Sequence, residues 1–152
     1  MVNMKNESGK VRIFWEEFLK STGRSETTEC FEVFHFELTE KVANELLRLV
    51  LIGQKKATAS SLWSYEIRGE KLPKVGDLSV VTDWEGSPKC VIETTSVAII
   101  PFSEITYDIC KREGEDNWNH GVKDILNILL KKVNIQVMIL RKTCLLFLKI
   151  LK

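Results

Sequence analysis

The chain has 152 residues, with 22 basic and 21 acidic side chains and a formal net charge of +1. This length favours one domain that can bury a hydrophobic core without disulfides or metals. The near balance of charge argues against a protein that coats nucleic acid through bulk charge.

Cysteine spacing and hydropathy exclude further classes. The four cysteines form no CxxC pair, so we predict neither a zinc site nor a redox pair, and we expect no cofactor. Residues 1–10 lack the apolar core of a signal peptide. No apolar run reaches the length of about 18 residues that a membrane span needs. We therefore expect a cytoplasmic protein without a membrane partner.

The first predicted element is an amphipathic helix over residues 10–20, which the sequence Ser21-Thr22-Gly23 ends. Residues 30–36 (CFEVFHF) then predict an aromatic strand. The apolar residues of the helix recur at the three-to-four spacing of a buried stripe: Val11, Phe14, Trp15, Phe18 and Leu19.

A second helix is predicted to begin after Thr39, a suitable N-cap, with Glu40 in its first turn. Gly53 follows its last apolar turn, where a left-handed cap is expected. The residues expected to be buried are Val42, Leu46, Leu49 and Val50.

Short strands and turns follow. Turns are predicted at residues 72–77 (LPKVGD) and 83–88 (DWEGSP), and strands at residues 78–82 and 90–100. Short strands with turn signals between them are typical of a small barrel or sandwich. We therefore predict an α+β fold, with a mostly antiparallel β-barrel and flanking helices.

Residues 53–63 (GQKKATASSLW) place two lysines beside hydroxyl side chains and a tryptophan. A solvated loop explains these lysines without a site, because the helix dipole favours cations at a helix C-terminus. A pocket requires Lys55 and Thr58 to converge, although on a flat strand they would point to opposite faces. Convergence therefore predicts a turn between Gly53 and Ala57, and both interpretations stay open.

The motif Gly-x-Lys-x-x-Thr, formed by Gly53, Lys55 and Thr58, resembles the signature loop of the ASCH (activating signal cointegrator homology) domain. The resemblance covers residues 11–116 and includes the stretches LPKVGD, VVTDWEGSPKCVIETTSV and KREGE. It implies a single domain with a PUA-like barrel. It also implies that RNA or a nucleoside-like small molecule binds beside the loop.

Some ASCH proteins resemble amidohydrolases that deacetylate acetylcytidine, and others resemble ribonucleases. The resemblance implies Lys55, Thr58 and Glu113 as catalytic residues, with Glu115 as the alternative position for the acid. A threonine hydroxyl is a weak nucleophile until a base takes its proton. A lysine can be that base if burial or a second ammonium, such as that of Lys56, lowers its pKa. A glutamate can then carry a proton to the leaving amine.

Five further residues are expected to contact a ligand. The small amidohydrolases carry an Arg shortly after the Thr; here Ser60 and Ser61 stand there, and serine cannot grip a planar group bidentately. Trp63 either stacks on a base or packs against the barrel. Glu93 either points outward or is held inside, where it would orient Lys55. The five are Lys56, Ser60, Ser61, Trp63 and Glu93.

The charge distribution changes after Asp116. Residues 1–116 carry 15 basic and 20 acidic side chains, whereas residues 117–152 carry 7 basic and 1 acidic. ASCH proteins usually continue with an acidic, aromatic helix and a strand of the type DMxVVxExF. A/T-rich codons for this tail encode such an ending in a neighbouring frame. We therefore hypothesise that residues 117–152 are a frameshifted reading, in the gene or in its sequencing.

Mass spectrometry tests this hypothesis. If the frame was shifted in sequencing, the purified protein will have a mass other than 17.5 kDa, and tryptic peptides of residues 117–152 will be missing. An intact mass of 17.5 kDa with those peptides present rules out a sequencing error.

Overall fold

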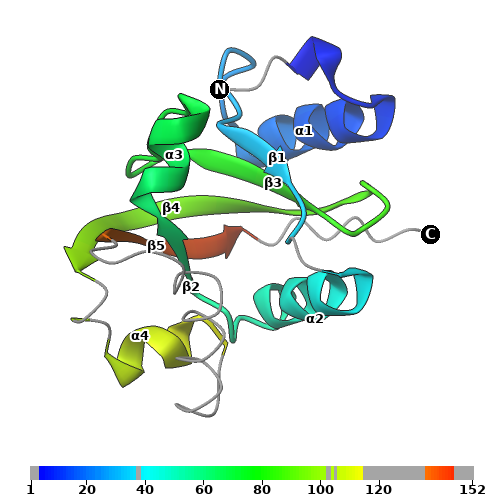
Figure 1. The fold of residues 1–152 in the computed structure, drawn as a ribbon. Coiled ribbons are helices and arrows are strands. Elements are labelled where there is room, and N and C mark those ends of the chain that lie inside the picture. Colours follow the sequence, from blue (N-terminus) through cyan, green and yellow to red (C-terminus); the bar gives the residue numbers. More distant parts are fainter. Residues whose placement is uncertain (1–3, 37–38, 102–103, 105, 115–135, 146–152) are drawn as a thin grey trace.

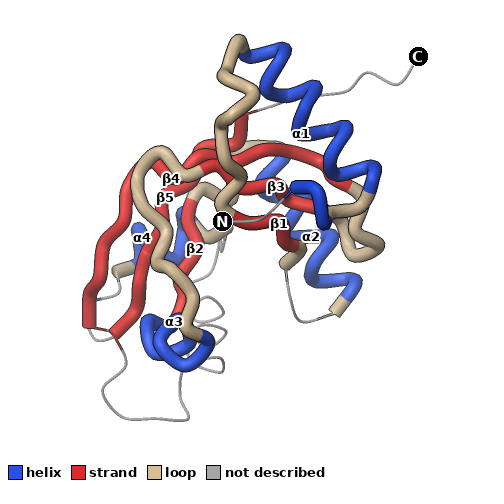
Figure 2. Tube along the Cα trace, turned by 90° about the horizontal axis from the view of Figure 1, so that it is seen from above, coloured by secondary structure: helices blue, strands red, loops and turns tan. Residues whose placement is uncertain are grey.

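The computed structural model describes residues 4–36, 39–101, 104, 106–114 and 136–145. Its centre is one five-stranded sheet with the strand order β1-β3-β4-β5-β2, and α1 and α2 lie on opposite sides of it (Figure 1, Figure 2). The helices are Met4–Asn6 (a short 3-10 helix), α1 Gly9–Thr22, α2 Glu40–Leu51, α3 Leu62–Arg68 and α4 Tyr107–Arg112. The strands are β1 Glu32–Phe34, β2 Ala57–Ser61, β3 Leu78–Thr82, β4 Pro88–Pro101 and β5 Gln136–Leu145.

The sheet confirms the α+β class and corrects the closed barrel. β1 pairs with β3 in parallel, and the other three pairings are antiparallel. In the described part of the chain β1 and β2 are the two edges, so the sheet is open. β1 has three residues, which offer few backbone groups to a second partner. Glu115 and His120 lie outside the described residues.

Helix α1 matches its prediction. The Ser8 side chain accepts a hydrogen bond from the Val11 N–H at 3.3 Å and caps the N-terminus. Gly23 has φ 64° and ends the helix in the left-handed conformation. The whole predicted stripe is buried, including Trp15, which is 3% exposed.

Helix α2 begins as predicted but buries a different stripe. The Thr39 hydroxyl accepts from the Val42 N–H at 3.4 Å. Val42 itself is 37% exposed, because the side of the helix that meets the sheet is displaced by one residue from the predicted one. The buried residues are Ala43, Leu47, Leu49 and Val50.

Each face of the sheet carries its own core because side chains alternate along a strand. Val80 and Val91, which are cross-strand partners, pack with α1. Val81 and Ile92 pack with α2 on the other face. The centre of the sheet is therefore buried on both sides, which fixes the register of β3 and β4.

Sequence reasoning missed α3 and α4. Residues 62–68 were expected to belong to a run of strands, yet α3 starts directly after β2 and ends at Gly69 with φ 62°. Within the described residues, no helix has the length and apolar character needed to cross a membrane.

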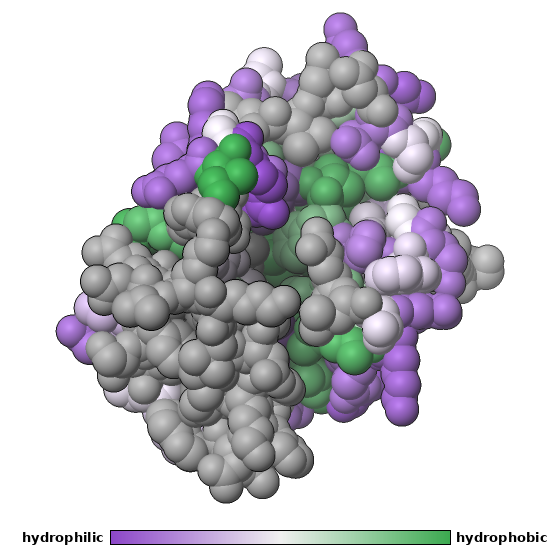
Figure 3. All heavy atoms as spheres, in the orientation of Figure 1, coloured by the Kyte–Doolittle hydropathy of each residue, from purple (hydrophilic) through white to green (hydrophobic). Residues whose placement is uncertain are grey.

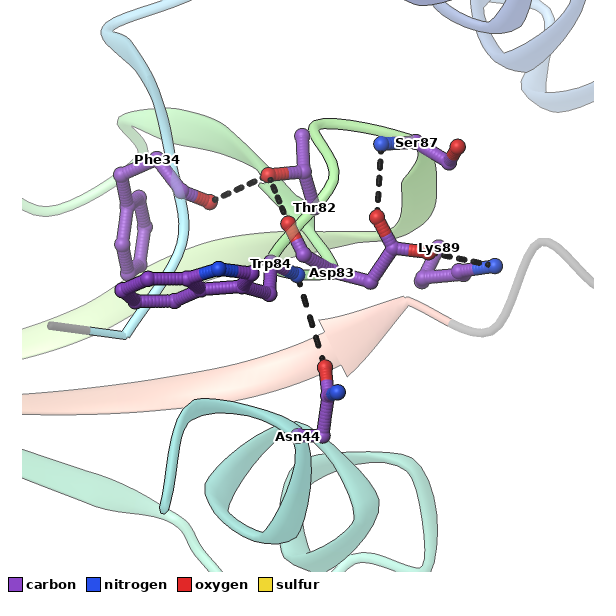
Figure 4. A network of polar contacts seen from close by, with 7 residues as sticks. All are labelled: Phe34, Asn44, Thr82, Asp83, Trp84, Ser87 and Lys89. Atoms are coloured by element: carbon purple, nitrogen blue, oxygen red, sulfur yellow. Dashed lines mark hydrogen bonds and ion pairs between the residues drawn. The ribbon is translucent and has the colours of Figure 1, made fainter. Parts of the chain in front are cut away.

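The turn between β3 and β4 is held by Asp83 (Figure 4). One carboxylate oxygen accepts from the Ser87 N–H at 2.8 Å, and the other lies 2.9 Å from Lys89 Nζ. Burial alone would raise the pKa of the Asp83 carboxyl. The hydrogen bonds from Lys89 and the Ser87 N–H outweigh burial, so this pKa falls below its ordinary 3.8.

Replacing Asp83→Asn should lower the free energy of unfolding by about 1–2 kcal/mol at neutral pH. Because its folded-state pKa is lowered, the carboxylate stabilises the protein above its unfolded pKa, and this stability is lost as pH falls through the folded pKa. Urea unfolding should therefore show the difference shrinking below about pH 4. Asp108→Asn, which removes an exposed partner of Arg112, is the control and should change stability by less than about 0.5 kcal/mol. A difference for Asp83→Asn that persists at acidic pH contradicts the prediction.

Candidate functional site

The loop between α2 and β2 turns at Gly53, which has φ 75°. The N–H groups of Gln54 and Lys55 both donate to the Leu49 carbonyl, at 2.9 and 3.0 Å. The loop thereby folds back over the end of α2, as a left-handed cap predicts. The predicted turn between Gly53 and Ala57 is confirmed. Lys55 is 7% exposed, so the solvated-loop interpretation is wrong for this lysine.

The Lys55 ammonium is held on several sides. Its Nζ donates to the carbonyls of Ala57 at 2.9 Å and Glu113 at 3.2 Å. The Glu113 carboxylate lies 3.7 Å from Nζ, and the Phe36 ring centroid lies 5.6 Å away. Two carbonyl dipoles, a carboxylate and an aromatic face all favour a positive charge at this atom. The geometry therefore keeps Lys55 as an ammonium.

The segment that ends α4 docks along the same loop. The Lys56 N–H donates to the Arg112 carbonyl at 2.6 Å, and Gln54 Nε2 donates to the Gly114 carbonyl at 3.4 Å. The segment that carries Glu113 is thus attached on both sides of Lys55. The structure brings Lys55 and Glu113 together, as the resemblance implied.

Gly114 is a residue that sequence reasoning missed. Its φ is 99°, and a Cβ there would come within 2.9 Å of Leu49 Cδ1 and 3.5 Å of Lys55 Cβ. A glycine just after a helical stretch signals such a position, but the sequence does not reveal its approach to α2. Only glycine lets the Glu113 segment lie this close to the Lys55 loop.

A small hollow lies beside the ammonium. It encloses about 10 Å³, which is room for about one water molecule. Figure 3 shows a recess with hydrophobic side chains in the same face of the molecule. The residues lining the hollow are Phe36, Val50, Lys55, Lys56, Ala57, Thr58 and Ile92.

Strand register assigns Thr58 to the face of the hollow. Thr58 is opposite position 140 of β5, and Ile92 is opposite position 144. Positions four apart in a strand share a face, so Thr58 and Ile92 lie on the same side of the sheet. Ser60 is two residues beyond Thr58 and shares this side, whereas Ser61 falls on the opposite side.

The other expected ligand contacts are distributed differently. Lys56 is exposed at the rim of the hollow. The Ser60 hydroxyl bonds to the Tyr65 phenol of α3. Ser61 occupies the N-cap position of α3 without a capping hydrogen bond from its side chain. Trp63 lies in α3 rather than in a strand, and its side chain is outside what the structure describes.

Glu93 does not orient Lys55, which corrects the inward alternative. Its Oε2 lies 3.1 Å from Arg24 Nη2, just beyond α1. Ile92 faces the hollow, so the next residue faces the other side of the sheet. The partner of Lys55 is Glu113 instead.

The site can bind through one buried cation, one hydroxyl and apolar walls. An ammonium in this position can donate to a carbonyl or stabilise a developing oxyanion. Within the described residues, no three His, Cys, Asp or Glu side chains gather as metal ligands would.

Comparisons with known proteins agree with this geometry. A family model described as the ASCH domain matches residues 32–139. An ASCH domain structure from Lactobacillus crispatus JV V101 superposes with a TM-score of 0.80 at 28% identity, covering 94% of this chain and 98% of that chain. Protein EF3133 from Enterococcus faecalis V583 shares the fold, with a TM-score of 0.77 at 24% identity over 90% of this chain and 88% of its own. No curated protein sequence shows significant similarity.

Replacing Gly114→Ala should destabilise the chain through both the backbone and the contact with Leu49. We expect a loss of about 2–3 kcal/mol in urea unfolding. Gly86→Ala is the matched control, because Gly86 also has a positive φ of 79° but nothing lies within 4 Å of a Cβ there. It should lose about 1–2 kcal/mol. Equal losses would mean that close packing against the loop contributes nothing.

Proposed function

Because this chain belongs to the ASCH domain family, we propose that it binds RNA or a modified nucleoside in the hollow beside the Gly53–Thr58 loop. The observation that carries this proposal is the buried Lys55 ammonium at the edge of a hollow with apolar walls. Ligand sites typically combine apolar lining with a few fixed polar groups. Phe36 and Ile92 supply the first, and Lys55 and Thr58 supply the second.

The size of the hollow supports a ligand that inserts one small polar group. Its enclosed volume of about 10 Å³ suits a carbonyl or acyl oxygen rather than a whole base. The rest of the ligand would lie over the rim, where Lys56 is exposed. The net charge of +1 favours a small ligand or a short single strand over a long duplex, which binds mainly through many phosphate contacts.

Amide hydrolysis is the second candidate function, and the proximity of Glu113 to Lys55 favours it. In this reaction the Thr58 oxygen would attack the acyl carbon, the carbon–nitrogen bond would break, and water would then release acetate. The contacts of Lys55 favour its ammonium form, so it would stabilise the oxyanion rather than act as the base. The Glu113 carboxylate would then take the hydroxyl proton and pass it to the leaving amine.

Isothermal titration calorimetry with N4-acetylcytidine and a short single-stranded RNA tests the proposal. Thr58→Val keeps the shape of the side chain and removes its hydroxyl, so we expect affinity to fall by up to about tenfold. Thr95→Val, an exposed threonine of β4, is the control and should bind normally. Absence of binding to either probe, or normal binding by Thr58→Val, contradicts the proposal.

The same samples separate the candidate functions. Release of acetate from N4-acetylcytidine that Thr58→Val abolishes identifies an amidohydrolase, and shortening of labelled RNA identifies a nuclease. Binding without either reaction identifies a binding module. Affinity for RNA should fall as salt rises, whereas affinity for an uncharged nucleoside should not.

A further inference from the structure

A row of three residues extends from the hollow to the edge of the sheet. Ile92, which lines the hollow, is opposite Ser79 of β3, and Ser79 is opposite Glu32 of β1. Residues opposite one another share a face of the sheet. Glu32 therefore lies on the same face as the hollow, two strand spacings away, or about 10 Å.

Glu32 is held by a buried hydroxyl. The Ser79 Oγ donates to Glu32 Oε1 at 3.3 Å, and Ser79 is 1% exposed. Glu32 itself is partly exposed. A carboxylate can accept about four hydrogen bonds, so it can take hydroxyl donors from a ligand while Ser79 fixes its position.

Tyr65 lies near Glu32 from the other side. Its phenol bonds to Ser60, which shares the face of Thr58. Burial raises the pKa of the Tyr65 phenol, and the negative charge of Glu32 raises it further. The phenol therefore stays protonated at neutral pH and can donate a hydrogen bond.

The two ends of this face differ in charge, which restricts the ligand. Lys55 at one end suits a carbonyl or acyl oxygen. Glu32 at the other end suits a pair of hydroxyl donors and repels phosphate. A nucleoside has this polarity, because its base carries the acceptor and its ribose carries a vicinal diol. The separation of about 10 Å is comparable with the span of a nucleoside.

Resting on the proposed function, we propose that Glu32 and Tyr65 form a ribose subsite, so that the ligand is a ribonucleoside with its base at Lys55. Glu32 accepts from the ribose hydroxyls, as carboxylates do in dinucleotide sites. Tyr65 donates to a sugar oxygen. This subsite selects ribose over deoxyribose, a selection that the hollow beside Lys55 does not make.

Calorimetry with N4-acetylcytidine and its 2′-deoxy analogue tests the subsite. We expect wild-type protein to bind the ribonucleoside about tenfold more tightly, because the analogue loses a hydrogen bond to a charged group. Glu32→Gln should reduce the affinity for the ribonucleoside to that for the analogue, while affinity for the analogue changes less than about twofold. Glu26→Gln, an exposed glutamate beyond α1, is the control and should keep the preference.

The outcomes separate the two proposals. If both nucleosides bind equally to wild-type protein, the hollow binds as proposed but the ribose subsite is wrong. If neither binds, both proposals fail. A ribose preference that survives Glu32→Gln also overturns the subsite. Circular dichroism checks folding, and if Glu32→Gln does not fold, Tyr65→Phe replaces it. Its ribose preference should then fall at least about threefold, and an unchanged preference overturns the subsite.

Discussion

The burial of the Lys55 ammonium is the constraint on which the site depends. An ion removed from water costs several kcal/mol unless opposite charge and hydrogen bonds surround it. Here those partners come from Ala57 at the start of β2 and from Glu113 beyond α4. The end of α2, the start of β2 and the end of α4 must therefore meet at one point, and a change in any of them exposes or strands the charge.

The same constraint explains why two glycines flank the site. Gly53 turns the loop so that Lys55 points inward, and Gly114 lets the opposing segment approach α2. A side chain at either position would have to adopt a positive φ. The ion pair and the two turns thus form one unit: the turns bring the charges together, and the charges offset the strain of a compact junction.

Local signals predicted the elements, but three-dimensional register decided the site. The Thr39 cap, the Gly53 turn and the strands at residues 78–82 and 90–100 follow from residue chemistry over a few positions. The face on which Glu93 lies does not, because it depends on which neighbour of a strand residue packs against α2. The displaced stripe of α2 and the open sheet have the same origin, since both depend on packing between segments distant in sequence. The motif Gly-x-Lys-x-x-Thr gave the position of Lys55 through family resemblance, not through periodicity.

The environment of Lys55 also bears on how such a site can act. From sequence, a buried lysine next to a second lysine suggests a lowered pKa and a general base. In the structure, Lys56 points to solvent while a carboxylate, two carbonyls and an aromatic face surround Lys55 Nζ. These groups stabilise the cation, so its natural role is to attract electrons in a ligand rather than to remove a proton. A binding module and an oxyanion-stabilising enzyme both use that property. What separates them is whether the Thr58 hydroxyl can reach an acyl carbon while the ligand is held, and this depends on how deeply a single polar group enters a hollow the size of one water molecule.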